Sequence, residues 1–161
     1  MRRIKIRLRR RRAKKMSDLE FMRSLDLLGT YEDMTNIINF ITSRILITPD
    51  KLQSLLWLAY GWGLTILNYE IAPLQFVQTP YGPAEININK LYPAWDSAII
   101  PQVPAPKLNP KVEHILTSTI KTYGSLSNEE LDELISWHCK DVSPGEDISA
   151  REIFMFFSKT V

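Results

Sequence analysis

One segment, residues 49–67, restricts the fold more than any other part of the chain. It opens with Thr48-Pro49-Asp50, a helix cap followed by proline at the first helical position, where the missing N–H costs nothing. Its second half is apolar on nearly every side. A helix that is hydrophobic all round must be enclosed by other elements. The segment therefore predicts the central helix of a bundle, with three aromatic side chains in the core: Trp57, Tyr60 and Trp62.

Other parts of the chain carry clear sequence signals for helix N-termini. Ser17, Ser127 and Ser149 each precede a glutamate by three residues, the capping-box pattern in which serine and glutamate satisfy two orphan backbone amides. Residues 31–45 add apolar side chains at the helical i, i+3, i+4, i+7 spacing. Together these signals predict helices over 17–28, 31–45, 49–67, 110–123, 128–138 and 150–158.

The middle of the chain has a different character. Residues 72–78 have the pattern of a short strand. The turn-forming run Thr79-Pro80-Tyr81-Gly82-Pro83 ends this strand, so it is either a single strand or one arm of a small hairpin. A brief helix over 84–91 and a proline-rich surface loop over 92–110 follow. We therefore expect a mainly α fold, a single helical domain with a small β-strand or hairpin element. Trp95, in the loop, is the aromatic residue that we expect to contact a partner.

Charge divides the chain into two unlike parts. Residues 1–15 hold 10 of the 20 basic residues and no acid, so residues 16–161 hold 10 basic and 18 acidic residues, a net charge of −8. Within that domain, residues 129–152 carry 8 acidic and 2 basic residues, a net of −6. This acidic stretch suits a basic protein partner through long-range attraction. Its candidate contact residues are Glu129, Glu130 and Glu133.

The basic head, residues 1–15, allows three hypotheses. Arg9, Arg10, Arg11 and Arg12 form a cationic run that suits the phosphates of a nucleic acid. Alternation of charges with Ile4, Ile6 and Leu8 also fits a membrane surface. Alternatively the head is not native and Met16 is the start, because Arg-Arg pairs are what a translated purine-rich ribosome-binding sequence encodes. The domain boundaries we expect are 1–15 for this extension, 16–33 for an N-terminal helix and 34–160 for the main domain.

Catalysis and metal binding are not indicated by the sequence. His138 and Cys139 are adjacent, but neighbours on a helix point apart, whereas a nucleophile needs its base within hydrogen-bond reach. The acidic residues of 129–133 have no second histidine at ligand spacing. We therefore expect no enzyme activity and no cofactor, and interpret His138 as a core polar residue or, alternatively, a partner contact.

Several features favour a soluble, cytoplasmic protein. Cys139 is the only cysteine, so no internal disulfide can form, as is usual in a reducing compartment. The head lacks the apolar run of a secretory signal. The most apolar stretch, residues 55–67, is shorter than the ~20 residues that span a membrane.

The run Asp50-Lys-Leu-Gln-Ser-Leu-Leu-Trp-Leu-Ala-Tyr-Gly-Trp62 and residues 34–41 before it have counterparts in a known family. They resemble the central helix and the opening helix of the Panacea domain, the SocA-like family of phage-associated antitoxins. Tyr81-Gly82-Pro83 resembles a family Gly-Pro motif. Residues 123–131 and 135–138 are similar to its later segments. The resemblance covers about residues 34–158.

This resemblance implies a non-enzymatic module on a mainly helical fold. Panacea antitoxins neutralise diverse toxins by direct binding, many are encoded by phages or prophages, and one branch delivers its toxin to a bacterial protease. The implied partner is a cognate toxin. Alternatives are a phage-encoded inhibitor of a host defence protein on the same scaffold, or a nucleic-acid-binding regulator using the basic head. The candidate protein contacts are Tyr81, Trp95, Glu129, Glu130, Glu133 and His138.

Overall fold

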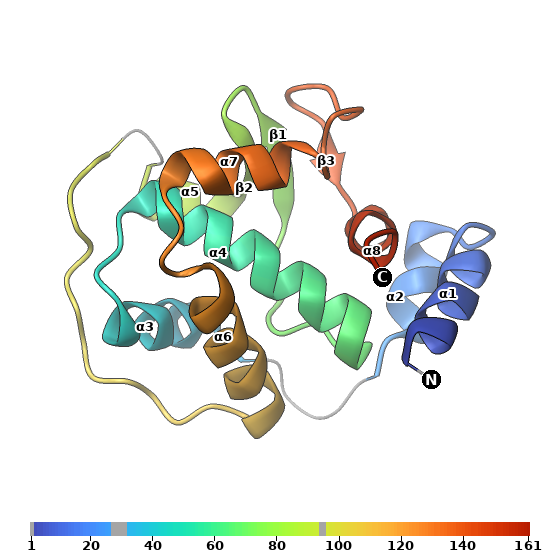
Figure 1. Cartoon of the computed structure of the whole chain (residues 1–161), viewed down its shortest axis with the longest axis horizontal. Coiled ribbons are helices and arrows are strands. Elements are labelled where there is room, and N and C mark those ends of the chain that lie inside the picture. The colour runs from blue at the N-terminus through green and yellow to red at the C-terminus, as the bar shows by residue number, and fades with distance from the viewer. Residues whose placement is uncertain (1, 27–31, 94–95) are drawn as a thin grey trace.

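A central helix organises the protein, as the sequence predicts. The structure is a computed structural model that describes residues 2–26, 32–93 and 96–161. Helix α4 (Pro49–Trp62) is buried along nearly its whole length and lies in the middle of the molecule (Figure 1). Trp57 and Tyr60 are buried in the core, whereas Trp62 is partly exposed. The hydrophobic character of this helix on all sides is thus explained by its neighbours.

The predicted helix 49–67 does not stay α-helical to its end. Its last turn is a π-helix, η1 (Gly63–Leu67), closed by Asn68 in the left-handed conformation with φ 55°. Two features account for the change. Gly61 and Gly63 weaken the α-helical turn, and the Thr65 hydroxyl donates to the Gly61 carbonyl at 2.8 Å, competing with the backbone ladder.

Further helices cover α4. Helices α6 (Pro110–Tyr123), α7 (Asn128–Ser136) and α8 (Ala150–Ser158) each pack against it, while α3 (Met34–Arg44) contributes Ile37, Phe40 and Ile41 to the same core. Helix α2 (Asp18–Ser24) packs on α8, where Arg151 forms an ion pair with Asp18 at 2.9 Å. The predicted helices therefore exist, with ends trimmed by a few residues.

The predicted serine caps are confirmed. Ser17, Ser127 and Ser149 each accept a hydrogen bond from the amide of the glutamate three residues on, at 3.1 Å in all three cases. At Ser127 the glutamate also reaches back, which completes the capping box. The helix predicted from residue 31 begins at Met34, because Asp33 supplies the cap by accepting from the Thr35 amide.

A small antiparallel sheet packs beside the central helix. Strand β1 (Phe76–Thr79) pairs with β2 (Gly82–Glu85) in a hairpin and, on its other side, with β3 (Asp147–Ile148). Helix α5 (Ile86–Leu91) follows the hairpin directly. The predicted strand and hairpin are confirmed, although the helix predicted over 84–91 starts only after β2. A mainly α fold with a small β element is therefore what the chain forms.

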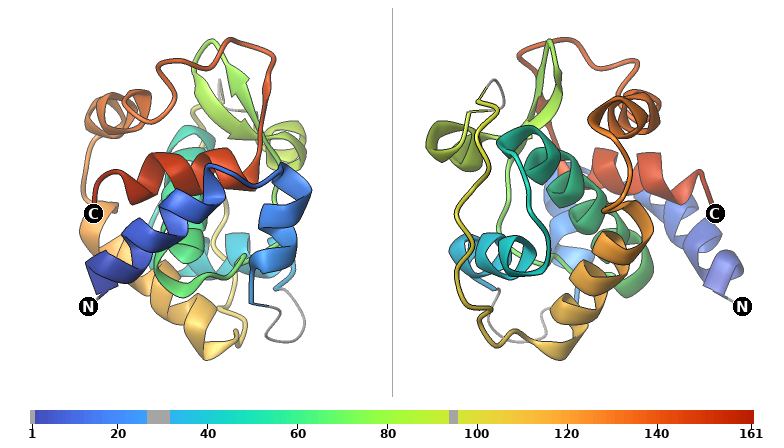
Figure 2. Two further views of the ribbon diagram at one scale, coloured as in Figure 1. Left: turned by 90° about the vertical axis from the view of Figure 1, so that its right-hand side faces the viewer. Right: turned by 60° about the vertical axis from the view of Figure 1, so that its left-hand side comes forward.

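The basic head is a helix, which the sequence analysis did not predict. Helix α1 (Arg2–Ala13) packs on α8 and contacts η1. Figure 2 shows it beside α8 at the edge of the molecule. Ile6 and Ala13 are buried, on the helix face that also carries Arg9 and Arg10. None of the helices among residues 2–26, 32–93 and 96–161 has the length and apolar character needed to cross a membrane.

Candidate functional site

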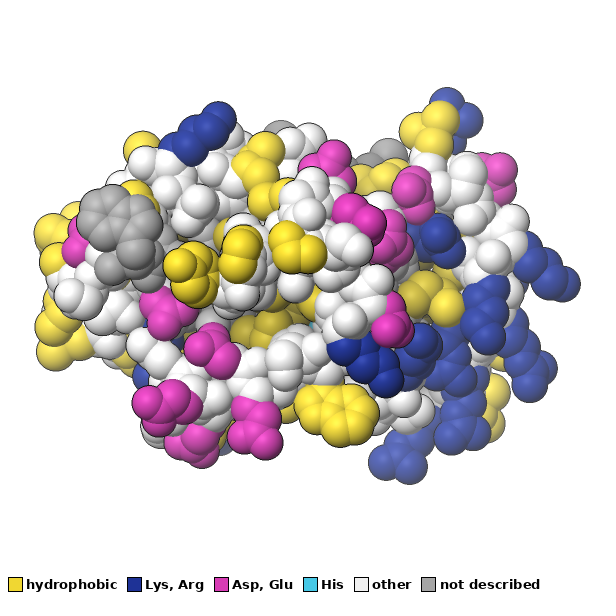
Figure 3. All heavy atoms as spheres, turned by 90° about the horizontal axis from the view of Figure 1, so that it is seen from above, with side chains coloured by type: hydrophobic (Ala, Val, Ile, Leu, Met, Phe, Trp, Pro, Cys, Tyr) yellow, Lys and Arg dark blue, Asp and Glu magenta, His cyan; other side chains and the backbone are white. Residues whose placement is uncertain are grey.

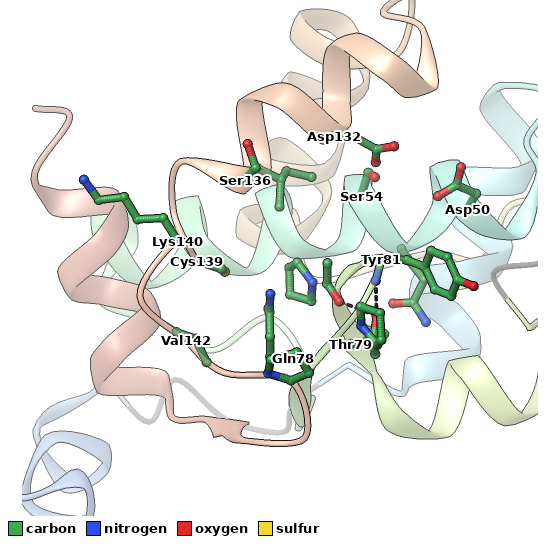
Figure 4. A pocket seen from close by; sticks show the side chains of 17 residues that line it. Asp50, Ser54, Gln78, Thr79, Tyr81, Asp132, Ser136, Cys139, Lys140 and Val142 are labelled. Atoms are coloured by element: carbon green, nitrogen blue, oxygen red, sulfur yellow. Dashed lines mark hydrogen bonds between the residues drawn. The ribbon is translucent and has the colours of Figure 1, made fainter.

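A groove of about 730 Å³ lies between the β-hairpin and α7. The first turns of α4 form its floor, the hairpin residues 78–84 form one wall, and the C-terminal half of α7 with the loop after it forms the other. Figure 4 shows side chains from these elements converging on the groove. The groove therefore depends on three segments that are far apart in the sequence.

Its floor is fixed to the hairpin by two buried residues, Gln53 and Glu85. The Gln53 side chain donates to the Glu85 carbonyl at 3.2 Å and accepts from the Glu85 amide at 2.8 Å. The Glu85 carboxylate in turn accepts from the backbone amides of Gln75, Asn87 and Ile88, at 2.7, 2.7 and 3.1 Å. Glu85 is thus both the cap of α5 and the joint between hairpin and central helix. The hairpin wall is held in one position relative to α4.

Tyr81 projects from the tip of that wall. Its backbone amide donates to the Thr79 hydroxyl at 3.1 Å, and this hydroxyl donates to the Gly82 carbonyl at 2.7 Å. Gly82 has a φ of +113°, a conformation that residues with a Cβ resist. The Tyr81 side chain is 87% exposed. A well-fixed turn therefore presents a large aromatic ring to solvent.

A second aromatic residue, Trp137, lies beyond the opposite wall and was missed by the sequence analysis. Its side chain is 73% exposed, and the Lys140 ammonium lies 5.6 Å from the ring centroid. A signal for it existed. Leu131 and Ile135 define the buried face of α7, and a residue two positions after Ile135 points to the other side. Two exposed aromatic residues thus flank the groove.

Acidic side chains gather on the α7 side of this face (Figure 3). Glu129, Glu130 and Glu133 are exposed, as a contact role requires. Asp132, on α7, lies near Asp50 at the start of α4 (Figure 4). Partial burial raises the pKa of both carboxyls, and for Asp132 the charges of Asp50 and Glu129 raise the pKa further. These carboxylates repel one another, so a cation placed between them would be stabilised.

Gln78 adds an unused acceptor to the groove wall. Its side-chain carbonyl oxygen is buried and accepts no hydrogen bond from any described residue. The side chain points into the groove (Figure 4). Buried polar atoms are normally paired, because leaving one unpaired costs about 1–3 kcal/mol. A donor supplied by a bound partner would remove that cost.

His138 makes its described contacts with core aromatic residues. The Trp57 indole N–H donates to His138 Nδ1 at 3.2 Å, and the imidazole stacks on Phe157 with ring centroids 4.3 Å apart. Burial lowers the pKa of His138. Burial and the charge of Glu152 raise the pKa of Cys139 to about 12, which favours the protonated thiol over the nucleophilic thiolate. His138 is therefore occupied by core contacts, and we leave it out of the contact surface.

The remaining predicted residues are distributed as follows. Trp95 lies outside the described residues. Arg9 and Arg10 turn inward and donate to backbone carbonyls of η1 and α8, whereas Arg11 and Arg12 are exposed. Across the described ranges, no three His, Cys, Asp or Glu side chains are grouped so that they could hold a metal ion.

The fold and groove define a small helical protein with one acidic, aromatic-flanked surface. Comparisons of the chain with known protein families, with characterised proteins and with solved structures found no match.

Proposed function

We propose that this protein is a protein-binding module of the Panacea antitoxin type, which neutralises a toxin or another target protein by direct binding. The observation that carries the proposal is the groove between the hairpin and α7, which Tyr81, Asp50 and Asp132 line and which ends beside the exposed Trp137, the residue after the lining residue Ser136. Aromatic residues dominate the energetics of protein interfaces. Both rings are largely exposed to solvent, at 87% for Tyr81 and 73% for Trp137, so they are accessible to a partner.

The charges of the surface indicate the chemistry of the partner. A basic segment would be attracted to α7 over a distance and would meet Asp50 and Asp132 at the groove. A Lys or Arg side chain between these carboxylates would offset their repulsion. A donor from the same segment could pair with the buried Gln78 oxygen. The proposed partner is therefore a basic protein that inserts a chain segment.

The mechanism we propose is stoichiometric occlusion of the partner, without a chemical step. Two features of the pair weighed for catalysis support this mechanism: burial raises the pKa of the Cys139 thiol to about 12, and His138 Nδ1 accepts from the Trp57 indole. Delivery of the bound partner to a bacterial protease, as in one branch of the family, is a further possibility of the same binding mode. We place the protein in the cytoplasm and associate it with phages or prophages.

The test is co-expression with a neighbouring reading frame whose product is toxic alone. The wild-type chain should restore growth and co-purify with that product. Changing Tyr81→Ala together with Trp137→Ala should weaken binding, because hot-spot aromatics contribute about 2 kcal/mol each, or roughly 30-fold in Kd per residue. The matched control is Leu19→Ala with Leu46→Ala, two exposed hydrophobic residues on other elements, in α2 and just after α3.

Two results would contradict the proposal. One is equal binding by the aromatic variant and the control variant, measured by calorimetry with both variants folded. The other is loss of protection in the control alone. If the protein captures a host defence component and no toxic neighbour exists, the same surface serves the alternative function, an inhibitor on this scaffold.

A further inference from the structure

The basic residues of α1 and of the two positions after it, Lys14 and Lys15, form two groups, one that contacts the rest of the protein and one that is exposed to solvent. Arg9 and Arg10, together with the buried Ile6 and Ala13, form the face that docks on η1 and α8. The other basic residues of the head are exposed. They are Arg2, Arg3, Lys5, Arg7, Arg11, Arg12, Lys14 and Lys15. Attachment of the helix therefore leaves most of its positive charge facing solvent, at the edge of the molecule (Figure 3).

These exposed cations are arranged in two rows. Arg3, Arg7 and Arg11 are spaced four residues apart, so they follow one side of the helix at about 6 Å intervals. Lys5 and Arg12 are seven residues apart and follow the other side. Between the rows lies a narrow apolar stripe, Ile4 and Leu8, which are 59% and 48% exposed. The solvent face is thus a thin apolar strip with cations on both sides.

Among the described residues, these exposed cations form no ion pair. Residues 2–17 contain no acid, and neither of the two ion pairs found among the described residues involves α1. Cations at i, i+4 spacing repel one another and destabilise the helix. A bound polyanion would reverse this repulsion. The arrangement therefore favours a ligand with regularly spaced negative charges.

We propose that the exposed face of α1 binds the major groove of double-helical DNA. An α-helix with its side chains is about 10–12 Å across and fits the major groove, which is ~12 Å wide. The two cationic rows would face the phosphates of the two groove walls, and arginine suits phosphate because its planar fork donates in pairs. Ile4 and Leu8 would face the groove floor, where thymine methyl groups accept apolar contact.

The observations favour DNA over an anionic membrane. Only two aliphatic side chains, Ile4 and Leu8, are exposed on α1. Membrane-surface helices gain their affinity by burying a broad apolar face. Duplex RNA is disfavoured as well, because its major groove is deep and too narrow for a helix. This inference does not depend on the function proposed for the groove at α7.

The experiment is fluorescence anisotropy of the full chain with a labelled 20-base-pair DNA duplex over a range of salt concentrations. Contact by about five cations predicts a slope of log K against log salt near −4.5, at ~0.9 per phosphate. Arg11→Gln with Arg12→Gln should reduce the magnitude of the slope by about 2, as should Arg3→Gln with Arg7→Gln. The matched control, Lys90→Gln with Lys107→Gln, removes equal charge at exposed residues elsewhere and should leave the slope unchanged.

Far-ultraviolet circular dichroism establishes that each variant is folded, and having two independent α1 variants keeps the test decisive if one is not. The same sequence as duplex RNA should bind more weakly than the DNA. The proposal is overturned by salt-independent or undetectable DNA binding, by an equal effect of the control, or by equal affinity for the RNA. Partition into phosphatidylserine vesicles without DNA binding would overturn it in favour of a membrane surface.

Discussion

Arg9 stabilises the C-terminal end of the central helix, and replacing it tests how the basic head is attached. The last carbonyls of a helix have no intrahelical partner. At this end the guanidinium donates to the Leu64 and Thr65 carbonyls at 3.1 and 3.0 Å, and to Asn68 Oδ1 at 2.6 Å. The same group lies 4.5 Å from the centroid of the Phe154 ring. Arg9 thus caps η1 from another part of the chain.

The expected magnitude follows from these contacts. Hydrogen bonds from a charged donor contribute about 1.5–3 kcal/mol in favourable cases, a cation at a helix C-terminus ~0.3–1 and a cation–π contact ~0.5–1. The site is only partly buried, so water replaces part of the hydrogen bonding when the guanidinium is removed. Desolvation of the charge, which lowers the pKa of Arg9, subtracts further. We expect Arg9→Met to cost about 3 kcal/mol of unfolding free energy.

The assay is equilibrium unfolding in urea, followed by tryptophan fluorescence. In thermal unfolding of a chain of this size, the same loss of about 3 kcal/mol corresponds to a fall in Tm of roughly 6–12 °C. Arg9→Lys should recover part of the loss, because lysine keeps the charge but lacks the planar fork. Arg11→Met is the matched control, since Arg11 is exposed, and should change stability by less than about 0.5 kcal/mol. Equal stabilities for Arg9→Met and Arg11→Met would refute the capping role.

Three other predictions follow from buried groups. Gly61→Ala should cost about 2–3 kcal/mol in urea unfolding, because its Cβ would lie 2.1 Å from the Phe157 ring, and Phe157→Leu should restore part of the loss. Burial raises the pKa of Glu70 above its usual 4.5, although Tyr60 donates a hydrogen bond to the carboxylate at 2.5 Å. Ionisation of Glu70 therefore lowers the stability of the folded state as the pH rises above 4.5. Glu70→Gln should stabilise the protein near pH 8, and this gain should vanish in acid, where Glu70 is protonated. With its pKa raised from 9.0 to about 12, Cys139 should react with a thiol reagent about a thousandfold more slowly in the folded than in the urea-unfolded protein.

Local signals predicted most of the fold. Serine hydroxyls at Ser17, Ser127 and Ser149 act within one helical turn, so their pattern is visible in the sequence and each formed the expected hydrogen bond. Strand β3 has only two residues and gains its order from pairing with Phe76 and Val77, about seventy positions away in the chain. Such a strand carries no alternating pattern of its own. The π-helical turn of η1 likewise involves the hydrogen bond from the Thr65 hydroxyl to the Gly61 carbonyl and those from Arg9, more than fifty positions away in the chain.

The candidate site was predicted only in part for the same reason. Tyr81 and the α7 carboxylates are exposed where turn and helix signals place them. The groove between them is made by the contact of Gln53 with Glu85, two polar residues whose burial no local pattern indicates. The helical form of α1 was missed because ten basic residues in fifteen suggest an unstructured tail. In the folded protein, Arg9 and Arg10 donate to backbone carbonyls, which offsets part of the repulsion between the basic side chains of the helix.

This docking also changes how the two proposed surfaces can be separated. Deleting residues 1–15 would remove the exposed cations of α1, but it would also uncap η1 and expose Phe154. A loss of protein binding after such a deletion would therefore reflect lost stability as readily as lost contact. Point changes at Arg11 and Arg12 leave the docking face intact, and changes at Tyr81 and Trp137 leave α1 intact. Because the acidic groove and the basic helix lie apart on the surface, each pair of changes should weaken one binding activity and spare the other (Figure 3).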